Sequence, residues 1–152
     1  MKKSLLLAIV LSFYSASCFA SVNSYLLALG GLVPGNTPEY IRSVFGTPTK
    51  VVDSKYFYGK GFEISFYDNF AVSIVSKANN GIGTPSGIRY GSTITEVMKK
   101  LGNPDKLPFY LRNEKNLIRY TDGDDGKNSR DLFIKFKDSR VVELTLTAAE
   151  AR

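Results

Sequence analysis

Two segments of the chain have apolar residues at helical spacing. They are residues 41–45 and Ile94–Leu101, and in the second the apolar side chains fall at i, i+3, i+4 and i+7, which places them on one side of a helix. Thr37 and Thr93, or the polar residue just before each, can cap these helices, and Gly followed two residues later by Pro can stop them. The pattern predicts two short helices, each with one buried side.

Apolar and polar residues alternate after each helix. The apolar positions of this alternation are Phe62, Ile64 and Phe66 in the first half and Leu132, Ile134 and Phe136 in the second. A period of two is typical of a strand with one buried side. The polar pairs at 68–69 and 138–139 then predict turns, so each half contains a β-hairpin. A further strand precedes each hairpin, over Lys55–Tyr58 and residues 116–120.

The helices and hairpins form an internal repeat. Residues 32–48 align without gaps onto residues 88–104 at an offset of 56, and the hairpins align at an offset of 70, so the second copy carries a 14-residue insertion. The sequence therefore predicts an α+β fold of two tandem αβββ repeats, in which both helices pack on one face of an antiparallel sheet. In residue ranges, we expect a leader at 1–20, repeats at 21–77 and 87–152, and a linker at 78–86.

The first twenty residues have the pattern of a secretory signal peptide, with two lysines before an apolar stretch over residues 5–14. A membrane anchor is the alternative, but this stretch is shorter than the roughly 20 residues that span a bilayer. Lipid attachment at Cys18 is a second alternative, disfavoured because Ser15 stands where lipoproteins usually have Leu. We expect a periplasmic or secreted bacterial protein with no transmembrane segment after cleavage.

Composition narrows the chemistry that the chain can perform. It is 43% hydrophobic and 22% charged, which is ordinary for a globular protein. It contains no His, and its one Cys lies in the leader, so His-based triads, Cys-His nucleophiles and disulfides are excluded from the mature chain. The acids occupy turn and helix-start positions, where no catalytic pair stands out. We expect no enzyme activity, no cofactor and no metal; a two-carboxylate glycosidase is the enzymatic alternative.

The borders of the repeated helix resemble those of a known group of exported proteins. Gly-x-Thr and Gly-x-Pro frame each helix, at 35–37 and 46–48 and again at 91–93 and 102–104. This arrangement resembles the tandem-repeat β-lactamase inhibitor proteins (BLIP-like) and the single-copy SmpA/OmlA (BamE-type) outer-membrane assembly lipoproteins. The chain departs from the former in lacking their cysteines, and from the latter in having two units and no strong lipobox. The resemblance implies an exported, non-enzymatic module that binds another envelope or secreted protein through a sheet face.

The predicted contact surface is the side of the sheet opposite the helices. Aromatic residues beside basic ones are common interface anchors, although ordinary cross-strand pairing would also explain them. In the strand before the first hairpin, Phe57 points away from its neighbours Tyr56 and Tyr58, and the sequence leaves open which set faces outward. Phe70 lies at the exit of the first hairpin turn, where an exposed aromatic ring could insert into a partner's pocket. The predicted partner-binding residues are Tyr56, Tyr58, Tyr67, Phe70, Phe133, Lys135 and Lys137.

Positive charge supports an alternative function. The chain has 20 Lys+Arg and 14 Asp+Glu, a net charge of +6, which becomes 18 − 14 = +4 when the leader's two lysines are removed. The alternative is a binder of anionic envelope polymer or lipid headgroups through Lys135, Lys137, Arg119 and Arg140. No nucleic acid is expected, because the basic residues are dispersed. The acidic run from Asp122 to Gly126 lacks the spacing of a helix-loop-helix calcium site and predicts a solvated loop.

Overall fold

The computed structural model describes residues 22–123 and 129–148. The expected leader at 1–20, with Cys18, lies outside the described residues. Residues 124–128 of the acidic loop lie outside them as well.

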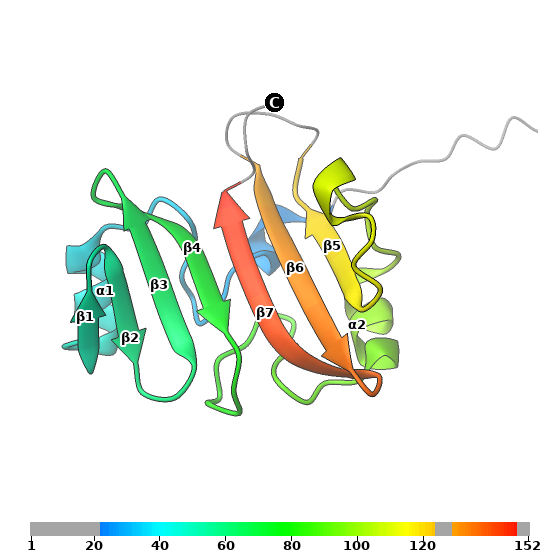
Figure 1. Cartoon of the computed structure of the whole chain (residues 1–152), viewed down its shortest axis with the longest axis horizontal. Helices are drawn as coiled ribbons and strands as arrows, with labels where there is room; N and C mark the ends of the chain where they lie inside the picture. Colours follow the sequence, from blue (N-terminus) through cyan, green and yellow to red (C-terminus); the bar gives the residue numbers. More distant parts are fainter. Residues whose placement is uncertain (1–21, 124–128, 149–152) are drawn as a thin grey trace, which may run out of the picture.

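A seven-stranded antiparallel sheet forms the body of the protein. Its strands are β1 (Lys50–Val52), β2 (Lys55–Tyr58), β3 (Phe62–Tyr67), β4 (Phe70–Ser76), β5 (Leu117–Thr121), β6 (Arg130–Lys137) and β7 (Arg140–Ala148). Their spatial order is β1-β2-β3-β4-β7-β6-β5, so β7, the last of these strands in the sequence, lies beside β4 at the centre (Figure 1). The sequence does not predict β1, because three residues are too few for an alternation to be recognised.

The predicted α+β class is wrong, because the sheet dominates the fold. The two α-helices, α1 (Pro38–Phe45) and α2 (Ile94–Leu101), have eight residues each, which is about two turns. Each buries only two of its residues, Pro38 and Ile41 in α1 and Val97 and Leu101 in α2. Helices this short do not make the helical layer that the predicted class requires.

Capping residues at both ends limit the length of the helices. The Thr37 hydroxyl accepts a hydrogen bond from the Tyr40 N–H at 3.3 Å in α1. In α2 the Thr93 hydroxyl accepts from the Glu96 N–H at 3.2 Å, and the Glu96 carboxylate accepts from the Thr93 N–H at 2.7 Å, which is a complete capping box. The helices end at Gly46 and Gly102, whose φ angles are 76° and 79°. Glycine adopts positive φ without steric cost, so each helix stops there.

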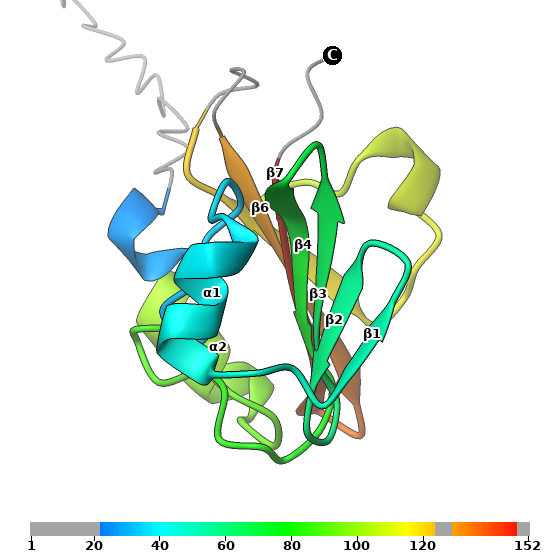
Figure 2. The same ribbon diagram turned by 90° about the vertical axis from the view of Figure 1, so that its left-hand side faces the viewer.

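The core lies on one side of the sheet, which we call the covered face. The buried sheet residues on this side include Phe62, Ile64, Ile74, Leu132, Ile134 and Leu144. Besides the helices, connecting segments cover them with the fully buried Leu27, Leu29, Leu32 and Ile88. Figure 2 shows the 3-10 helix η1 (Ser24–Leu26), α1 and α2 on this side of the sheet, and the 3-10 helix η2 (Phe109–Leu111) on the other. We call that opposite side the open face.

The two hairpins share the geometry of their turns. Each turns through two residues with positive φ, Asp68-Asn69 in the first and Asp138-Ser139 in the second, as a two-residue hairpin turn that matches the twist of its strands requires. Each also has a register shift just before the turn, at Ser65/Phe66 and at Lys135/Phe136. The two shifts are separated by the same 70 residues as the two hairpins.

Candidate functional site

The strand register arranges the side chains of the open face in rows. The central row crosses from β2 to β5 through Phe57, Glu63, Val75, Thr145, Phe133 and Arg119. All of them except Arg119 are half-buried, as on a sheet surface where side chains contact their lateral neighbours. Figure 1 looks onto this face. The row therefore presents two phenylalanine rings, one in each half of the sheet.

Two lysines flank Phe57 at one end of the central row. The Nζ atoms of Lys50 and Lys55 lie 5.8 and 6.0 Å from the centre of the ring, within the range of cation–π attraction. Lys55, Phe57 and Ser65 are among the residues that line a shallow pocket of about 320 Å³ at this end. The pocket offers an apolar ring beside the charged side chains of Lys55 and Asp53.

The other end of the row is also basic, but one of its cations is already paired. Lys135 and Lys137 are exposed. Arg119, in contrast, is buried and contacts Asp131 Oδ1 through Nε at 2.9 Å and Nη2 at 2.7 Å. Its Nη1 donates to the Lys106 carbonyl at 3.3 Å. Arg119 is therefore not available for the polyanion binding that the sequence analysis considered.

The structure places Tyr56 and Tyr58 on the covered face. Tyr56 is buried, its hydroxyl accepts a hydrogen bond from Arg42, and its ring packs edge-on against Phe66 at a centroid distance of 4.7 Å. The Tyr58 hydroxyl donates to the Gly46 carbonyl, at the end of α1, at 3.2 Å. Burial, and then the neighbouring Tyr56, raise the pKa of Tyr58. Neither tyrosine reaches the surface that carries Phe133 and Lys135.

The contact of Tyr58 belongs to the architecture of the repeat. Its counterpart Tyr120, on β5, donates its hydroxyl proton to the Gly102 carbonyl at the end of α2, at 2.9 Å. Burial and the nearby Asp105 raise the pKa of Tyr120 to about 12. Both tyrosines thus join a helix end to a strand, which is a structural role.

Tyr67 and Phe70 form an exposed aromatic pair at the tip of the first hairpin. They are direct partners across the turn, so their side chains share one side of the hairpin. Their exposed fractions are 78% and 49%, so the two rings form one exposed apolar patch. At the tip of the second hairpin, the equivalent pair is Lys137 and Arg140.

The predicted residues thus divide among three places. Phe133 and Lys135 lie together on the open face. Tyr67 and Phe70 form the tip of the first hairpin, and Lys137 lies at the tip of the second. Tyr56 and Tyr58 lie on the covered face. The sequence analysis left open whether Phe57 or the pair Tyr56 and Tyr58 faces outward, since alternation does not tell the two faces of a strand apart, and its predicted binding residues include the two tyrosines but not Phe57. The burial of its neighbour Tyr56 decides the matter.

The acidic residues form no metal centre in the described part of the chain. No group of three or more Asp, Glu, His or Cys residues within it is arranged to hold an ion. Asp122, the first residue of the acidic run, accepts a hydrogen bond from the Arg130 N–H at 2.6 Å. This bond closes the base of the loop between β5 and β6.

Neither a protein-family model nor a curated protein sequence matches the chain. Among solved structures, the chain is similar to an extracellular protein containing a SCP domain from Bacillus anthracis str. Ames, with a TM-score of 0.50 and 11% sequence identity. The match covers 97% of this chain and 49% of that one, so this chain spans about half the length of the neighbour. A likeness at this identity concerns the fold alone. None of the helices in the described ranges is long and apolar enough to cross a membrane.

Proposed function

We propose that this protein is an exported protein-binding module that contacts its partner through the open face of the sheet. Two features support export: the signal-peptide pattern of the first twenty residues, and the extracellular origin given for the structural neighbour. The proposal assigns the protein a partner and no reaction.

The central row of the open face carries the proposal. Phe57 and Phe133 are half-exposed aromatic residues in opposite halves of one continuous surface, with lysines beside both. Interfaces typically combine an apolar, aromatic centre with a polar rim. Truncating aromatic anchors of this kind often costs more than about 2 kcal/mol of binding free energy.

Site-specific photocrosslinking tests the proposal. A photoreactive phenylalanine analogue is placed at Phe57 or Phe133, or at Lys99 on the exposed side of α2 as the control, in the full chain produced by its own cells. The crosslinked proteins are captured at low and at high salt and identified by mass spectrometry. We expect one protein to be captured from both positions on the open face at both salt concentrations, because an aromatic contact is little screened by ions. Capture of no protein from the open face, or of the same proteins from Lys99, would overturn the proposal.

A further inference from the structure

The loop before each helix has the same backbone structure in both halves. In the first half the Val33 N–H donates to the Asn36 side chain at 2.9 Å, and in the second the Arg89 N–H donates to the Ser92 hydroxyl at 3.1 Å. The glycine that follows, Gly35 or Gly91, donates its N–H to the facing hairpin strand at 2.8 Å in each case. The backbone of the two loops is therefore held by matching hydrogen bonds.

The side chains at these two places differ in chemistry. Position by position, Val33, Pro34, Tyr40 and Phe70 in the first half correspond to Arg89, Tyr90, Glu96 and Arg140 in the second. The first half shows that valine and phenylalanine suffice where the second has arginines. The two arginines are therefore not required by the fold, and their presence calls for another explanation.

The arginines line a pocket on the exposed surface around the start of α2. The pocket has a volume of about 470 Å³, and its walls include Arg89, Arg140, Ser92 and Asn79. Within the described residues, the Arg89 guanidinium has no ion pair or hydrogen bond, and Arg140 uses Nη1 for the Gly91 carbonyl at 2.9 Å. Most of their N–H donors are free to bind a ligand.

One acid, Glu96, also lines the pocket, and the cap of α2 holds its carboxylate in place. The Glu96 carboxylate accepts hydrogen bonds from the Thr93 N–H and hydroxyl at 2.7 and 3.2 Å. Arg89 and Arg140 give two positive charges against this one carboxylate, so the pocket keeps a positive balance. Its donors come from two segments, the connection between the halves and the start of β7.

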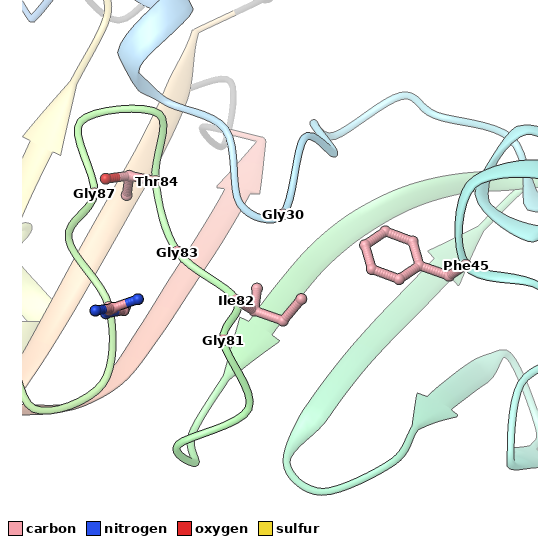
Figure 3. Close-up of a pocket in the computed structure, with 8 residues that line it drawn as sticks. Gly30, Phe45, Gly81, Ile82, Gly83, Thr84 and Gly87 are labelled. Carbon is pink, nitrogen blue, oxygen red and sulfur yellow. The ribbon is translucent and has the colours of Figure 1, made fainter.

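We propose that Arg89 and Arg140 form a binding site for a phosphate group that bears an organic substituent. Guanidinium groups bind phosphate oxygens through paired, charge-assisted hydrogen bonds, and Ser92 and Asn79 add neutral polar groups. A second pocket of about 500 Å³ also has Arg89 in its wall, together with Gly30, Phe45 and Ile82. Figure 3 shows the Ile82 and Phe45 side chains near Gly30 in this second pocket, where the organic part of the ligand would lie.

An NMR titration tests this site. The purified protein is titrated with glycerol 3-phosphate, with acetate as the comparison anion, while the amide signals of Gly91 and Ser92 are followed. We expect phosphate-specific shifts at these signals, and an affinity at least about tenfold lower in the double variant Arg89→Val/Arg140→Phe, because this variant removes the charge-assisted contacts to the phosphate. This variant carries the residues that the first half uses at the same positions. The control Lys106→Gln/Lys115→Gln removes the same charge at two exposed positions between α2 and β5, neither of which lines the pocket, and should retain the affinity.

The source of the phosphate is settled by a second arm with lipid vesicles. Binding to phosphatidylglycerol vesicles but not to phosphatidylcholine vesicles, lost in the same double variant, assigns a lipid headgroup; binding of glycerol 3-phosphate alone assigns a soluble phosphate ester. If Arg89→Val/Arg140→Phe fails to fold, Arg89→Gln/Arg140→Gln takes its place. The proposal is overturned if neither probe binds, if acetate binds equally well, or if the lysine control loses as much affinity as the arginine variant.

Discussion

Val75 and Thr145 lie directly opposite each other in the central strand pair, and they are also the same position of the repeat. They pair between β4 and β7, and 70 residues separate them, the offset that relates the two hairpins. Because each residue of this pair is the repeat equivalent of the other, a pseudo-twofold axis that relates the two repeats passes between them. The strand order therefore reads the same outward from this pair, and among the described strands β1 alone has no counterpart.

Removing the Tyr120 hydroxyl should destabilise the protein. In Tyr120→Phe, the Gly102 carbonyl loses the donor that it has at 2.9 Å at the end of α2. We expect a loss of about 1–2 kcal/mol in the free energy of unfolding, measured by urea denaturation, since a partly buried acceptor is left unpaired. Tyr67→Phe, at an exposed position, is the control and should change this free energy by less than about 0.5 kcal/mol. Equal losses in the two variants would contradict the role given to Tyr120.

Breaking the ion pair between Arg119 and Asp131 should strongly lower the free energy of unfolding, whereas replacing both residues by apolar ones should change it little. Asp131→Asn leaves a buried guanidinium without its counter-charge, and we expect about 3 kcal/mol of destabilisation in chemical denaturation. The apolar double variant Arg119→Met/Asp131→Leu should lie within about 1 kcal/mol of the wild type, because it removes both charges.

The surface pair of Glu63 and Lys77 provides the comparison, because Lys77 is 46% exposed. Glu63→Gln should cost less than about 1 kcal/mol. If Asp131→Asn cost no more than Glu63→Gln, burial would not govern the strength of the Arg119 pair.

The cap of α2 should make stability depend on pH. Hydrogen bonds from Thr93 hold the pKa of Glu96 below its ordinary value of 4.5. The folded state binds this proton less readily than the unfolded chain, so the contribution is complete above pH 4.5 and is lost as the pH falls through the lowered pKa. The stability difference between wild type and Glu96→Gln should therefore shrink on acidification, as followed by denaturation at a series of pH values.

The cap of α1 is the matched control for this pH dependence. Its third residue is Tyr40, so no carboxylate takes part in the capping contact of Thr37. Thr37→Val should lower stability by about 1 kcal/mol, and the loss should be the same across the acid range. A loss that varied with pH as much as that of Glu96→Gln would point to a source of the effect other than the capping box.

The aromatic tip of the first hairpin should matter for binding and not for folding. Tyr67→Ala/Phe70→Ala removes two exposed rings, so the free energy of unfolding should change by less than about 0.5 kcal/mol per residue. If the tip belongs to the contact surface, capture of the partner through the crosslinker at Phe133 should fall by about tenfold or more. Unchanged capture would remove Tyr67 and Phe70 from the interface.

The sequence predicts those parts of the fold that depend on neighbouring residues. The threonine caps, the glycine stops and the polar hairpin turns act within a few positions of the chain, and the structure has helices and turns at these residues. Phe133 and Lys135 could be assigned to the outer face for the same reason, because they alternate with the apolar residues Leu132 and Ile134, which are buried.

The remaining features depend on contacts that are distant in sequence. The class could not be judged from two amphipathic segments, because loop residues such as Leu29 and Ile88 bury as deeply as the helices do. The partners that accompany the burial of Arg119, the Asp131 carboxylate and the Lys106 carbonyl, are 12 and 13 residues away. The assignment of Tyr58 to the covered face depends on the end of α1, 12 residues away.

The central place of β7 has a consequence for the order in which the sheet can be completed. Of the described strands, Arg140–Ala148 is the last to be synthesised, yet this segment joins β4 to β6. Until it has been synthesised, both of those strands keep an unpaired edge, and such edges readily pair with foreign strands. A nascent chain would thus be most prone to aggregation just before β7 is synthesised, and a premature stop there would divide the sheet into two halves instead of removing an edge strand.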